Sequence, residues 1–439
     1  MSVSIPGDKW LPALLEGLAS WSRRVVEEAI SVATGQGRPL YVVGGVVRDF
    51  LLGRPGLDVD LLVEAPPGGV GPGDDPLLRE LAFRLEALLH PHPRFGTATL
   101  HLPGGGAVDV VRARTEIYDK PAALPRVEMG TISQDLARRD FTIGAMALRL
   151  TPGDSSPLLD LHGGREDLEE GRVRVLHAHS FEDDPTRLFR AVRLAARLGF
   201  ELEPATRMWM ELAFSRDYPD LLSPRRISAE LRKMAGEDSF PGALALLEEL
   251  GGLASLHLGP GVVYLSGLFG SYLLWRRGQF PVAHLPGVED PFLVVVLALL
   301  EGLPEGQRRR ALARWELGGG QGRQLLRDLE ICREIMGLLR FGAPRSQAVW
   351  VADELSPPGW VFLALKVYGS ELWGPFLHLL ECRLMKSPLN GRDLVALGVQ
   401  PGPRMAELQK GLRAALINGE ITSREDAEVM VRSTLEARL

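Results

Sequence analysis

The residues most suited to chemistry are two aspartates, Asp58 and Asp60, separated by Val59. The β-rich run LDVDLLVE predicts that they lie on a strand, where alternate side chains point to the same face. Two carboxylates on one face can chelate a hard cation, and Mg²⁺ takes such oxygens and completes its shell with water and substrate phosphates. An isolated DxD pattern is more typical of a solvated strand end than of a metal site, so the preceding segment has to decide between the two.

A glycine pair precedes these aspartates in the segment LYVVGGVVRDFLLGRPGLDVD, residues 40–60. The run LYVV predicts a buried strand that ends at Gly44 and Gly45, and a short apolar helix containing Arg48 follows. Glycines lack the Cβ atoms that keep a backbone away from phosphates, and a helix N-terminus presents unpaired N–H groups to an anion. We therefore expect a triphosphate here, because a turn without a ligand explains the glycines but neither Arg48 nor the carboxylates.

Arginines recur on one stripe of the segment FEDDPTRLFRAVRLAARLGF, residues 181–200. Arg187, Arg190 and Arg193 follow one another on a predicted helix, where they can neutralise phosphates. Cytosine and adenine both present an exocyclic amino donor beside a ring-nitrogen acceptor, whereas uracil and guanine present the reverse order. A carboxylate and a guanidinium, Asp184 and Arg187, would therefore select C and A together. The alternative for this segment alone is an ordinary solvated helix face.

Three segments resemble the motifs of one family, the class II tRNA nucleotidyltransferases and bacterial poly(A) polymerases. They are GGVVRDFLLGRPGLDVD, DLARRDFTIGAMAL and DDPTR, in the order in which the family has them. The resemblance implies that Asp58 and Asp60 hold catalytic metal ions and that Asp184 and Arg187 read the base.

The second of these motifs, residues 135–148, implies that Arg139 and Asp140 contact the incoming nucleotide. From the residues alone, Arg138 and Arg139 supply charged donors for a phosphate or ribose, and Asp140 can orient one of them or accept from a hydroxyl. An exposed salt bridge at a helix start is the alternative. Gly144 stands where the family usually has asparagine, and Asp183 stands where it usually has glutamate.

The elements that must position these residues change in character along the chain. Residues 11–35 carry apolar residues at helical spacing and predict one amphipathic helix. Residues 40–114 hold β-rich runs between Gly/Pro turns, which predict a sheet. The segments after residue 150 are predicted to be helical. Together with the resemblance, this predicts an α+β fold, in which a polymerase-β-like palm with a small mixed sheet is followed by an all-α neck, body and tail. The expected boundaries are an N-terminal helix at 1–37, the palm at 38–155, the neck at 156–250, the body at 251–385 and the tail at 386–439.

Weaker signals mark further candidate residues. Asp109, on the run AVDVVRAR, is either a third metal carboxylate or a strand-end acid. Arg225, Arg226 and Lys233 lie at a predicted helix start, SPRRISAELRKM, and are either contacts to RNA phosphates, which we expect, or solvated charges.

Two longer segments also resemble parts of the family. Residues 112–129 resemble its mobile segment, which helps to switch between CTP and ATP. Residues 388–427 resemble the tail with which bacterial tRNA nucleotidyltransferases reach the tRNA elbow, and Arg404 in the turn GVQPGPR would contact the RNA backbone there.

The composition excludes several classes of protein. The chain has 439 residues, with 45% hydrophobic and 24% charged, which is typical of a globular protein with more than one domain. Its net charge of -6 argues against a wholly basic surface, although a local basic face can still hold nucleic acid. Two cysteines cannot form a disulfide framework, and no secretion signal or membrane-spanning run is recognisable, so we expect a cytoplasmic protein.

These observations predict a template-independent nucleotidyltransferase that adds C and/or A nucleotides of the 3′-terminal CCA to tRNA. CTP and ATP would be the substrates, Mg²⁺ the cofactor and pyrophosphate the second product. tRNA would be bound at its 3′ end and elbow, and no protein partner is expected. The alternatives are a poly(A) polymerase and a catalytically silent RNA-binding relative. The sequence does not distinguish addition of CCA from addition of CC or of A alone.

Overall fold

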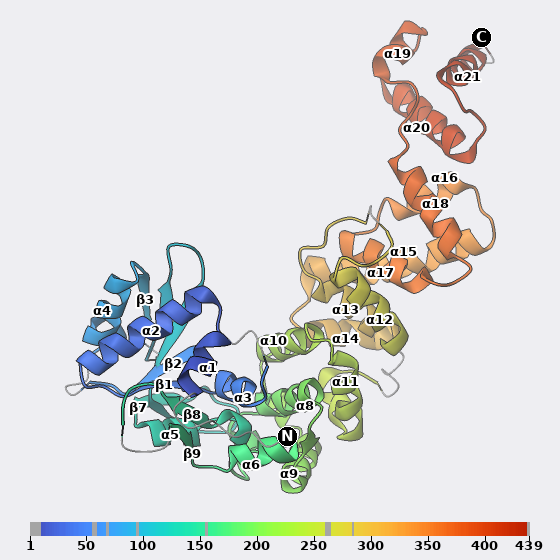
Figure 1. The fold of residues 1–439 in the computed structure, drawn as a ribbon. Helices are drawn as coiled ribbons and strands as arrows, with labels where there is room; N and C mark the ends of the chain where they lie inside the picture. Colours follow the sequence, from blue (N-terminus) through green and yellow to red (C-terminus); the bar gives the residue numbers. More distant parts are fainter. Residues whose placement is uncertain are drawn as a thin grey trace. The chain divides into compact units, whose positions relative to one another are not determined.

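The computed structural model describes residues 10–54, 59–66, 70–93, 96–153, 157–259, 265–282 and 285–436. The chain divides into two compact units, Met1–Ser255 and Leu256–Leu439. The described part of the first unit contains a sheet and helices, and that of the second contains helices alone (Figure 1). The finer division into palm, neck, body and tail stays a prediction.

A seven-stranded mixed sheet forms the centre of the first unit, in the order β3-β4-β5-β2-β1-β8-β9. β2 runs parallel to β5, and the other neighbouring strands are antiparallel. Two small sheets, β6-β7 and β10-β11, lie outside it. The strands are β1 (Leu40–Val43), β2 (Asp60–Val63), β3 (Leu88–His92), β4 (Thr97–His101), β5 (Ala107–Arg112), β6 (Arg114–Ile117), β7 (Arg126–Met129), β8 (Met146–Arg149), β9 (Leu158–Asp160), β10 (Arg172–Val173) and β11 (Glu201–Leu202).

Eleven α-helices accompany the strands in the described part of the first unit. They are α1 (Trp10–Glu16), α2 (Ser20–Gly35), α3 (Gly45–Leu51), α4 (Pro76–Arg84), α5 (Ile132–Ala137), α6 (Gly164–Glu170), α7 (Ser180–Asp183), α8 (Thr186–Leu198), α9 (Pro204–Ser215), α10 (Pro224–Ala235) and α11 (Phe240–Glu249). Short 3-10 turns are η2 (Pro72–Asp74), η4 (Thr142–Gly144), η5 (Tyr218–Leu221) and η6 (Gly252–Leu256).

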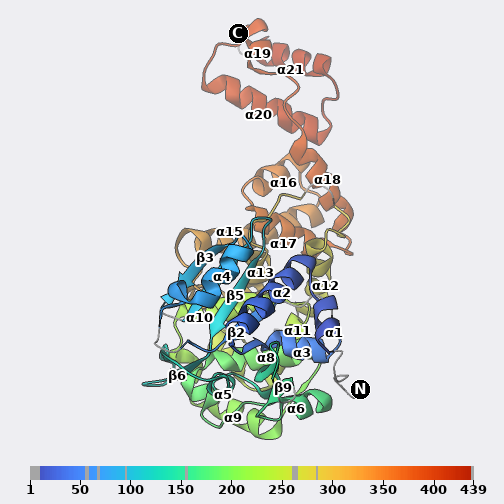
Figure 2. The same ribbon diagram turned by 60° about the vertical axis from the view of Figure 1, so that its left-hand side comes forward.

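The central strands are buried by helices. Tyr41 and Val43 of β1 share a core cluster with Leu62 of β2 and with Ile132 and Leu136 of α5. α2 contacts β1 and α4, and Figure 2 shows α2 and α4 beside the strands. Because β1 is buried along its whole length, its end is a rigid point from which the following glycine turn projects.

The first helical region differs from its prediction. Instead of one helix over residues 11–35, the structure has α1 and α2, interrupted at Gly17 and Leu18. The Gly17 N–H donates to the Leu14 carbonyl at 3.1 Å and closes the last turn of α1. The apolar spacing continues across the break. Glycine has a low helix propensity, however, and the helix ends before Gly17.

The second unit consists, in its described residues, of helices. They are α12 (Leu265–Arg276), α13 (Phe292–Glu301), α14 (Glu305–Arg314), α15 (Gly319–Arg340), α16 (Arg345–Ala352), α17 (Pro357–Val367), α18 (Trp373–Leu384), α19 (Gly391–Ala396), α20 (Pro403–Asn418) and α21 (Arg424–Glu436). The last three enclose their own core, which includes Leu394, Leu412 and Val431. Within the described ranges, none of the helices combines the length and the apolar character that crossing a bilayer requires.

Gly164 allows α6 to approach η4 closely. A Cβ atom there would lie 2.3 Å from the carbonyl oxygen of Thr142 and 3.0 Å from Cγ of Met146. We expect Gly164→Ala to lower the free energy of unfolding by about 1–3 kcal/mol, because the Thr142 backbone cannot move aside as a flexible side chain can. Urea unfolding measures the change. Gly104→Ala is the control, since a Cβ there meets nothing within 4 Å, and equal stability of the two variants would contradict the prediction.

Candidate active site

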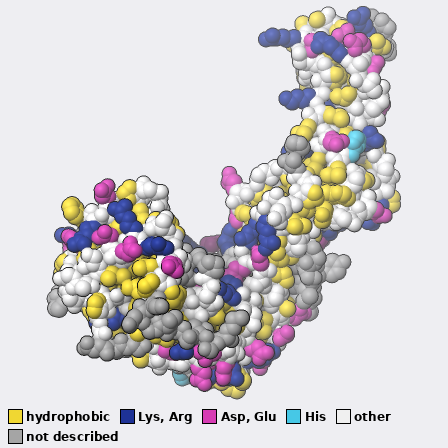
Figure 3. Space-filling model, in the orientation of Figure 1, with side chains coloured by type: hydrophobic (Ala, Val, Ile, Leu, Met, Phe, Trp, Pro, Cys, Tyr) yellow, Lys and Arg dark blue, Asp and Glu magenta, His cyan; other side chains and the backbone are white. Residues whose placement is uncertain are grey.

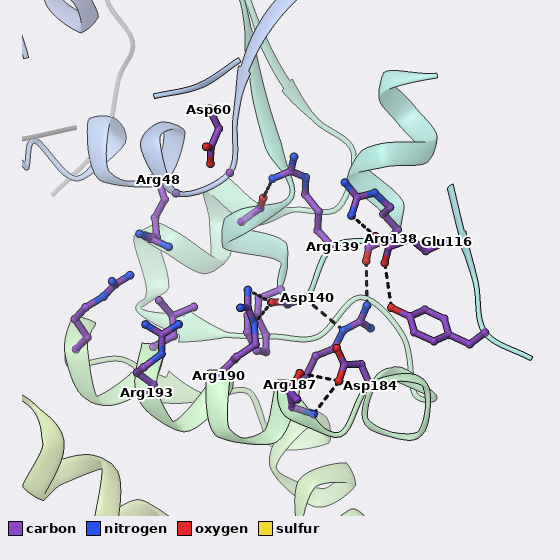
Figure 4. Close-up of a pocket in the computed structure, with 18 residues that line it drawn as sticks. Arg48, Asp60, Glu116, Arg138, Arg139, Asp140, Asp184, Arg187, Arg190 and Arg193 are labelled. Atoms are coloured by element: carbon purple, nitrogen blue, oxygen red, sulfur yellow. Dashed lines mark hydrogen bonds and ion pairs between the residues drawn. The ribbon is translucent and has the colours of Figure 1, made fainter. Parts of the chain in front are cut away.

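A cavity of about 450 Å³ opens in the first unit and is lined mainly by charged side chains (Figure 4). The lining arginines are Arg48, Arg138, Arg139, Arg187, Arg190, Arg193 and Arg197, and the lining acids are Asp60, Glu116, Asp140 and Asp184. The structure therefore brings the glycine turn, the second aspartate of the DxD pair, the RRD segment and the arginine stripe to one place. Such a lining suits a polyanion that also carries a neutral, hydrogen-bonding part.

The glycine turn forms one wall of the cavity. Gly44 has φ +77°, which L side chains rarely adopt, and a Cβ on it would lie 2.6 Å from Nη1 of Arg139. Its N–H donates to the Met146 carbonyl at 3.2 Å, which fixes the turn to β8. α3 begins at Gly45, so the first backbone N–H groups of this helix lie beside the cavity.

The arginines at one end of the cavity are restrained by acids. Arg48 is buried and donates from Nε and Nη2 to the two carboxylate oxygens of Asp49 at 2.9 and 2.8 Å. Arg193 donates to Glu237 at 2.8 Å, and Arg197 lies 3.7 Å from the same carboxylate. Burial, and then the nearby Arg48, lower the pKa of Arg197. This crowding of positive charge favours an anion at this end.

A buried carboxylate, Asp135, orients the two arginines of the RRD segment. Its Oδ1 accepts from Nη2 of Arg138 at 2.6 Å, and its Oδ2 accepts from Nη2 of Arg139 at 3.0 Å. Arg139 also donates from Nη1 to the Gly144 carbonyl at 3.3 Å. The prediction that Asp140 orients one of these arginines is therefore wrong, because Asp135 is one helical turn before them on α5 and reaches both.

Asp140 instead pairs with the arginine stripe of α8. It accepts from Nε of Arg190, and its Oδ1 lies 3.4 Å from Nε of Arg187. Burial disfavours the charged form of Arg190, but the carboxylates of Asp140, Glu230 and Asp184 together outweigh this effect, and the pKa of Arg190 is raised. Asp140 thus links the strand-bearing part of the first unit to α8.

Asp184 and Arg187 lie at the other end of the cavity from Arg48 and Arg193 (Figure 4). Their spacing of three residues is that of a shared helical face, but they do not share one, since α8 begins at Thr186 and Asp184 has the extended dihedral angles φ -137° and ψ 95°. Arg187 is buried and donates to Ser180 Oγ at 2.8 Å and to the Arg138 carbonyl at 3.0 Å. These bonds fix the plane of its guanidinium.

Glu116 in β6 and Tyr118, directly after this strand, complete this end of the cavity. Tyr118 donates to Oε2 of Glu116 at 3.0 Å, and Arg138 donates to Oε1 at 2.8 Å. Burial, and then the Glu116 carboxylate, raise the pKa of Tyr118. Its phenol therefore keeps its proton at neutral pH and stays a donor.

The candidate metal carboxylates are Asp58, Asp60 and Asp109. Asp58 lies outside the described residues. Asp60 and Asp109 are direct partners in the parallel β2-β5 ladder and are both exposed, so their side chains are on the same face. Thr99 donates to Oδ1 of Asp109 at 2.6 Å. Neighbouring carboxylates repel each other, and a cation between them relieves this repulsion, so the donor set fits a hard divalent metal.

The predicted RNA-binding residues are not grouped together. Arg225 and Lys233 are exposed on α10, and Lys233 donates to Glu230 at 2.8 Å. Arg226 is half-buried and donates to Asp184 at 2.6 Å, so its side chain belongs to the cavity region rather than to an open surface. Arg404 is exposed in the first turn of α20 in the second unit. Figure 3 shows basic side chains projecting from this C-terminal part.

Gly144, the first departure from the family's motifs, leaves space beside Arg139. Gly144 lines the cavity, and a Cβ atom there would meet nothing within 4 Å. An asparagine would therefore fit without displacing Arg139, whose bond uses the backbone carbonyl. Asp183, the second departure, lies 3.9 Å from Nε2 of His177.

Sequence reasoning missed Asp135 as a residue that shapes the site, and it placed Glu116 and Tyr118 only within residues 112–129, the segment that resembles the family's mobile one. Asp135 was detectable, because it precedes Arg138 and Arg139 by three and four residues on a predicted helix start, which is the spacing of helical ion pairs. Glu116 pairs with Arg138, 22 residues further along the chain, and Tyr118 donates to Glu116, so only the tertiary fold brings these two residues to the RRD segment.

Gly44 offers a test of the close contact between the turn and Arg139. We expect Gly44→Ala to destabilise the protein by about 1–2 kcal/mol through backbone strain and to displace the Arg139 guanidinium. Isothermal titration with CTP and ATP would then show weaker nucleotide binding. Gly104→Ala serves again as control, and unchanged nucleotide affinity of Gly44→Ala would contradict the prediction.

Comparison with known proteins agrees with these motifs. The family model described as the poly A polymerase head domain matches residues 40–174. The CC-adding tRNA nucleotidyltransferase of Deinococcus radiodurans is 34% identical over 417 residues, covering 93% of this chain and 92% of that protein. The A-adding tRNA nucleotidyltransferase of Geobacter sulfurreducens is 32% identical over 401 residues, covering 88% of this chain and 44% of that protein, so the chain spans less than half of this relative.

A solved structure shares the whole fold. The Thermotoga maritima CCA-adding enzyme complexed with tRNA superimposes with a TM-score of 0.77 at 27% identity, covering 97% of this chain and 98% of that one. The likeness confirms the predicted fold class, a mixed-sheet head followed by helices. By its sequence and its fold, this chain belongs to the tRNA nucleotidyltransferase family.

Proposed function

We propose that this chain adds C and/or A nucleotides of the 3′-terminal CCA to tRNA, using CTP and/or ATP and releasing pyrophosphate. The observation that carries the proposal is one cavity with a glycine turn and arginines at one end and Asp184 with Arg187 at the other. The first end suits a triphosphate and the second a base.

Base selection follows from the donors and acceptors at the second end. The Asp184 carboxylate can accept from the exocyclic amine of cytosine or adenine, and the Arg187 guanidinium can donate to the adjacent ring nitrogen. Uracil and guanine would place an acceptor against the carboxylate and a donor against the guanidinium. Because the contacts of Arg187 with Ser180 and Arg138 fix its plane, the protein itself acts as the template.

In the proposed reaction the 3′-hydroxyl of the tRNA attacks the α-phosphorus of the nucleotide in line. The O3′–Pα bond forms, the bond to the β-phosphate oxygen breaks, and the hydroxyl proton is released. A divalent metal, which we propose to be Mg²⁺, would lower the pKa of the hydroxyl and balance charge on the leaving oxygens. Asp58 and Asp60 would hold it, with Asp109 as a third ligand. Gly44, Gly45, Arg48, Arg190 and Arg193 would orient the triphosphate, and Arg139 and Asp140 would position the nucleotide.

The proposal also includes contacts with the tRNA phosphates and the place of the protein in the cell. Arg225, Lys233 and Arg404 are exposed and can contact tRNA phosphates, the last of them at the tRNA elbow. Both cysteines, Cys332 and Cys382, are free and buried. This suits the reducing conditions of the cytoplasm, where we propose that the protein acts.

Extension of three tRNA transcripts tests the function. The transcripts end at the discriminator base, at C and at CC, and each is incubated with Mg²⁺ and CTP, ATP or both, then resolved on a gel. We expect growth that stops at or before CCA, because the proposed activity adds no nucleotide beyond this end. Growth to CCA indicates the complete activity, and a stop at CC or extension of the CC transcript alone indicates a divided one. A long adenosine ladder, or no extension of any transcript, would contradict the proposal.

Substitution of Asp60 tests the proposal that its carboxylate holds a metal ion. We expect Asp60→Asn to lower kcat by about 10²–10³-fold, because the isosteric amide removes charge that a metal ion requires. Filter binding of tRNA should be unchanged, and so should the activity of the control Asp217→Asn, which lies exposed before η5 with φ +54°, a conformation that asparagine accepts. Activity of Asp60→Asn near that of the wild type would refute the assignment.

A further inference from the structure

Arg226 contacts two parts of the first unit at once. It lies in the first turn of α10, and its Nη2 donates to Oδ1 of Asp184 at 2.6 Å. Its Nη1 donates to the carbonyl oxygen of Ala122 at 3.0 Å. Asp184 and Ala122 are 62 residues apart in the chain, so a single guanidinium bridges segments that the sequence does not connect.

The contact fixes one of the two oxygens of the Asp184 carboxylate. Oδ1 also accepts from the backbone N–H and from Oγ1 of Thr186, at 2.9 and 2.7 Å. With Arg226 this oxygen has three donors, whereas Oδ2 has no hydrogen-bond partner among the described residues. Because Asp184 lines the cavity, Oδ2 is the oxygen left to accept from a ligand.

The other contact fixes the loop between β6 and β7, residues 118–125. Ala122 has φ +58° and donates its N–H to the Glu182 carbonyl in α7 at 3.2 Å. Since Glu182 is two residues before Asp184, the loop is attached to the base-reading segment twice, directly and through Arg226. The same loop begins with Tyr118, which lines the cavity.

We propose that Arg226 is a positioning residue for base selection, which couples the placement of the 118–125 loop to the orientation of the Asp184 carboxylate. This inference rests on the proposed function of Asp184 in base reading. A guanidinium suits the role because its planar fork reaches two acceptors in fixed directions, whereas a lysine ammonium is a point charge on a flexible stem. Without Arg226 the carboxylate is free to rotate, and a base that lacks the amino donor is rejected less strongly.

The test compares Arg226→Ala, Arg226→Lys and the control Arg216→Ala. Arg216 is exposed after α9 and has no side-chain partner among the described residues. For each protein, kcat/KM is measured with the cognate nucleotide and with UTP on the tRNA transcript that the wild type extends. We expect the ratio of the two values to fall about tenfold or more in Arg226→Ala, to fall less in Arg226→Lys, and to stay constant in Arg216→Ala.

Two further measurements distinguish a positioning role of Arg226 from a general loss of stability and from a role in RNA binding. Hydrogen exchange should become faster at the amides of Ala122 and Ala123 in Arg226→Ala, with the thermal transition retained. tRNA affinity should be unchanged, since the guanidinium is engaged within the protein. An equal loss for all nucleotides, weaker tRNA binding with an unchanged ratio, or unchanged loop exchange would each overturn the inference. If wild-type protein extends no tRNA, the proposed function fails, and the loop exchange still decides whether Arg226 couples the two segments.

Discussion

Seven arginine side chains surround a cavity of about 450 Å³, and their mutual repulsion is the constraint that the site has to satisfy. Each guanidinium keeps its charge at any accessible pH, so it cannot relieve the repulsion by losing a proton. The structure places carboxylates behind the arginines instead. Asp135 holds two of them from a fully buried position, and Asp49, Asp140 and Glu237 hold others.

This arrangement explains why acids and arginines alternate along the motifs. The acids behind the arginines fix the direction of each guanidinium while leaving N–H groups toward the cavity, so a bound nucleotide meets donors that are already oriented. The acids at the opposite end, Glu116 and Asp184, are themselves held by donors, namely Tyr118, Arg138 and Arg226. The ends therefore differ in character: one attracts an anion, and the other, where acids and arginines are paired, offers an acceptor for an amine.

The sheet supplies the rigid frame for this charge balance. β1 is buried along its length and delivers the glycine turn, and the parallel pairing of β2 with β5 sets Asp60 beside Asp109. α8 delivers the arginine stripe from the helical part of the same unit, and Asp140 joins it to the RRD segment.

The sequence by itself determined the motifs and the class of fold. Local spacing was sufficient for the strand that ends at Gly44, for the helix that carries Arg187, Arg190 and Arg193, and for the mixed-sheet and helical character of the two parts of the chain. These features depend on contacts between neighbours in the chain, which periodicity and turn residues report. The break at Gly17 was missed because the apolar spacing continues across it.

Only the tertiary structure decided which charges pair. Asp140 turned out to hold Arg190 rather than the arginines next to it, and Arg226 turned out to hold Asp184 rather than lie open to RNA. Ion pairs between distant segments depend on the packing of whole helices against the sheet, and residue type alone does not tell which of several carboxylates a guanidinium will reach. The identity of the charged residues is therefore readable from the sequence, and their partnership follows from the fold.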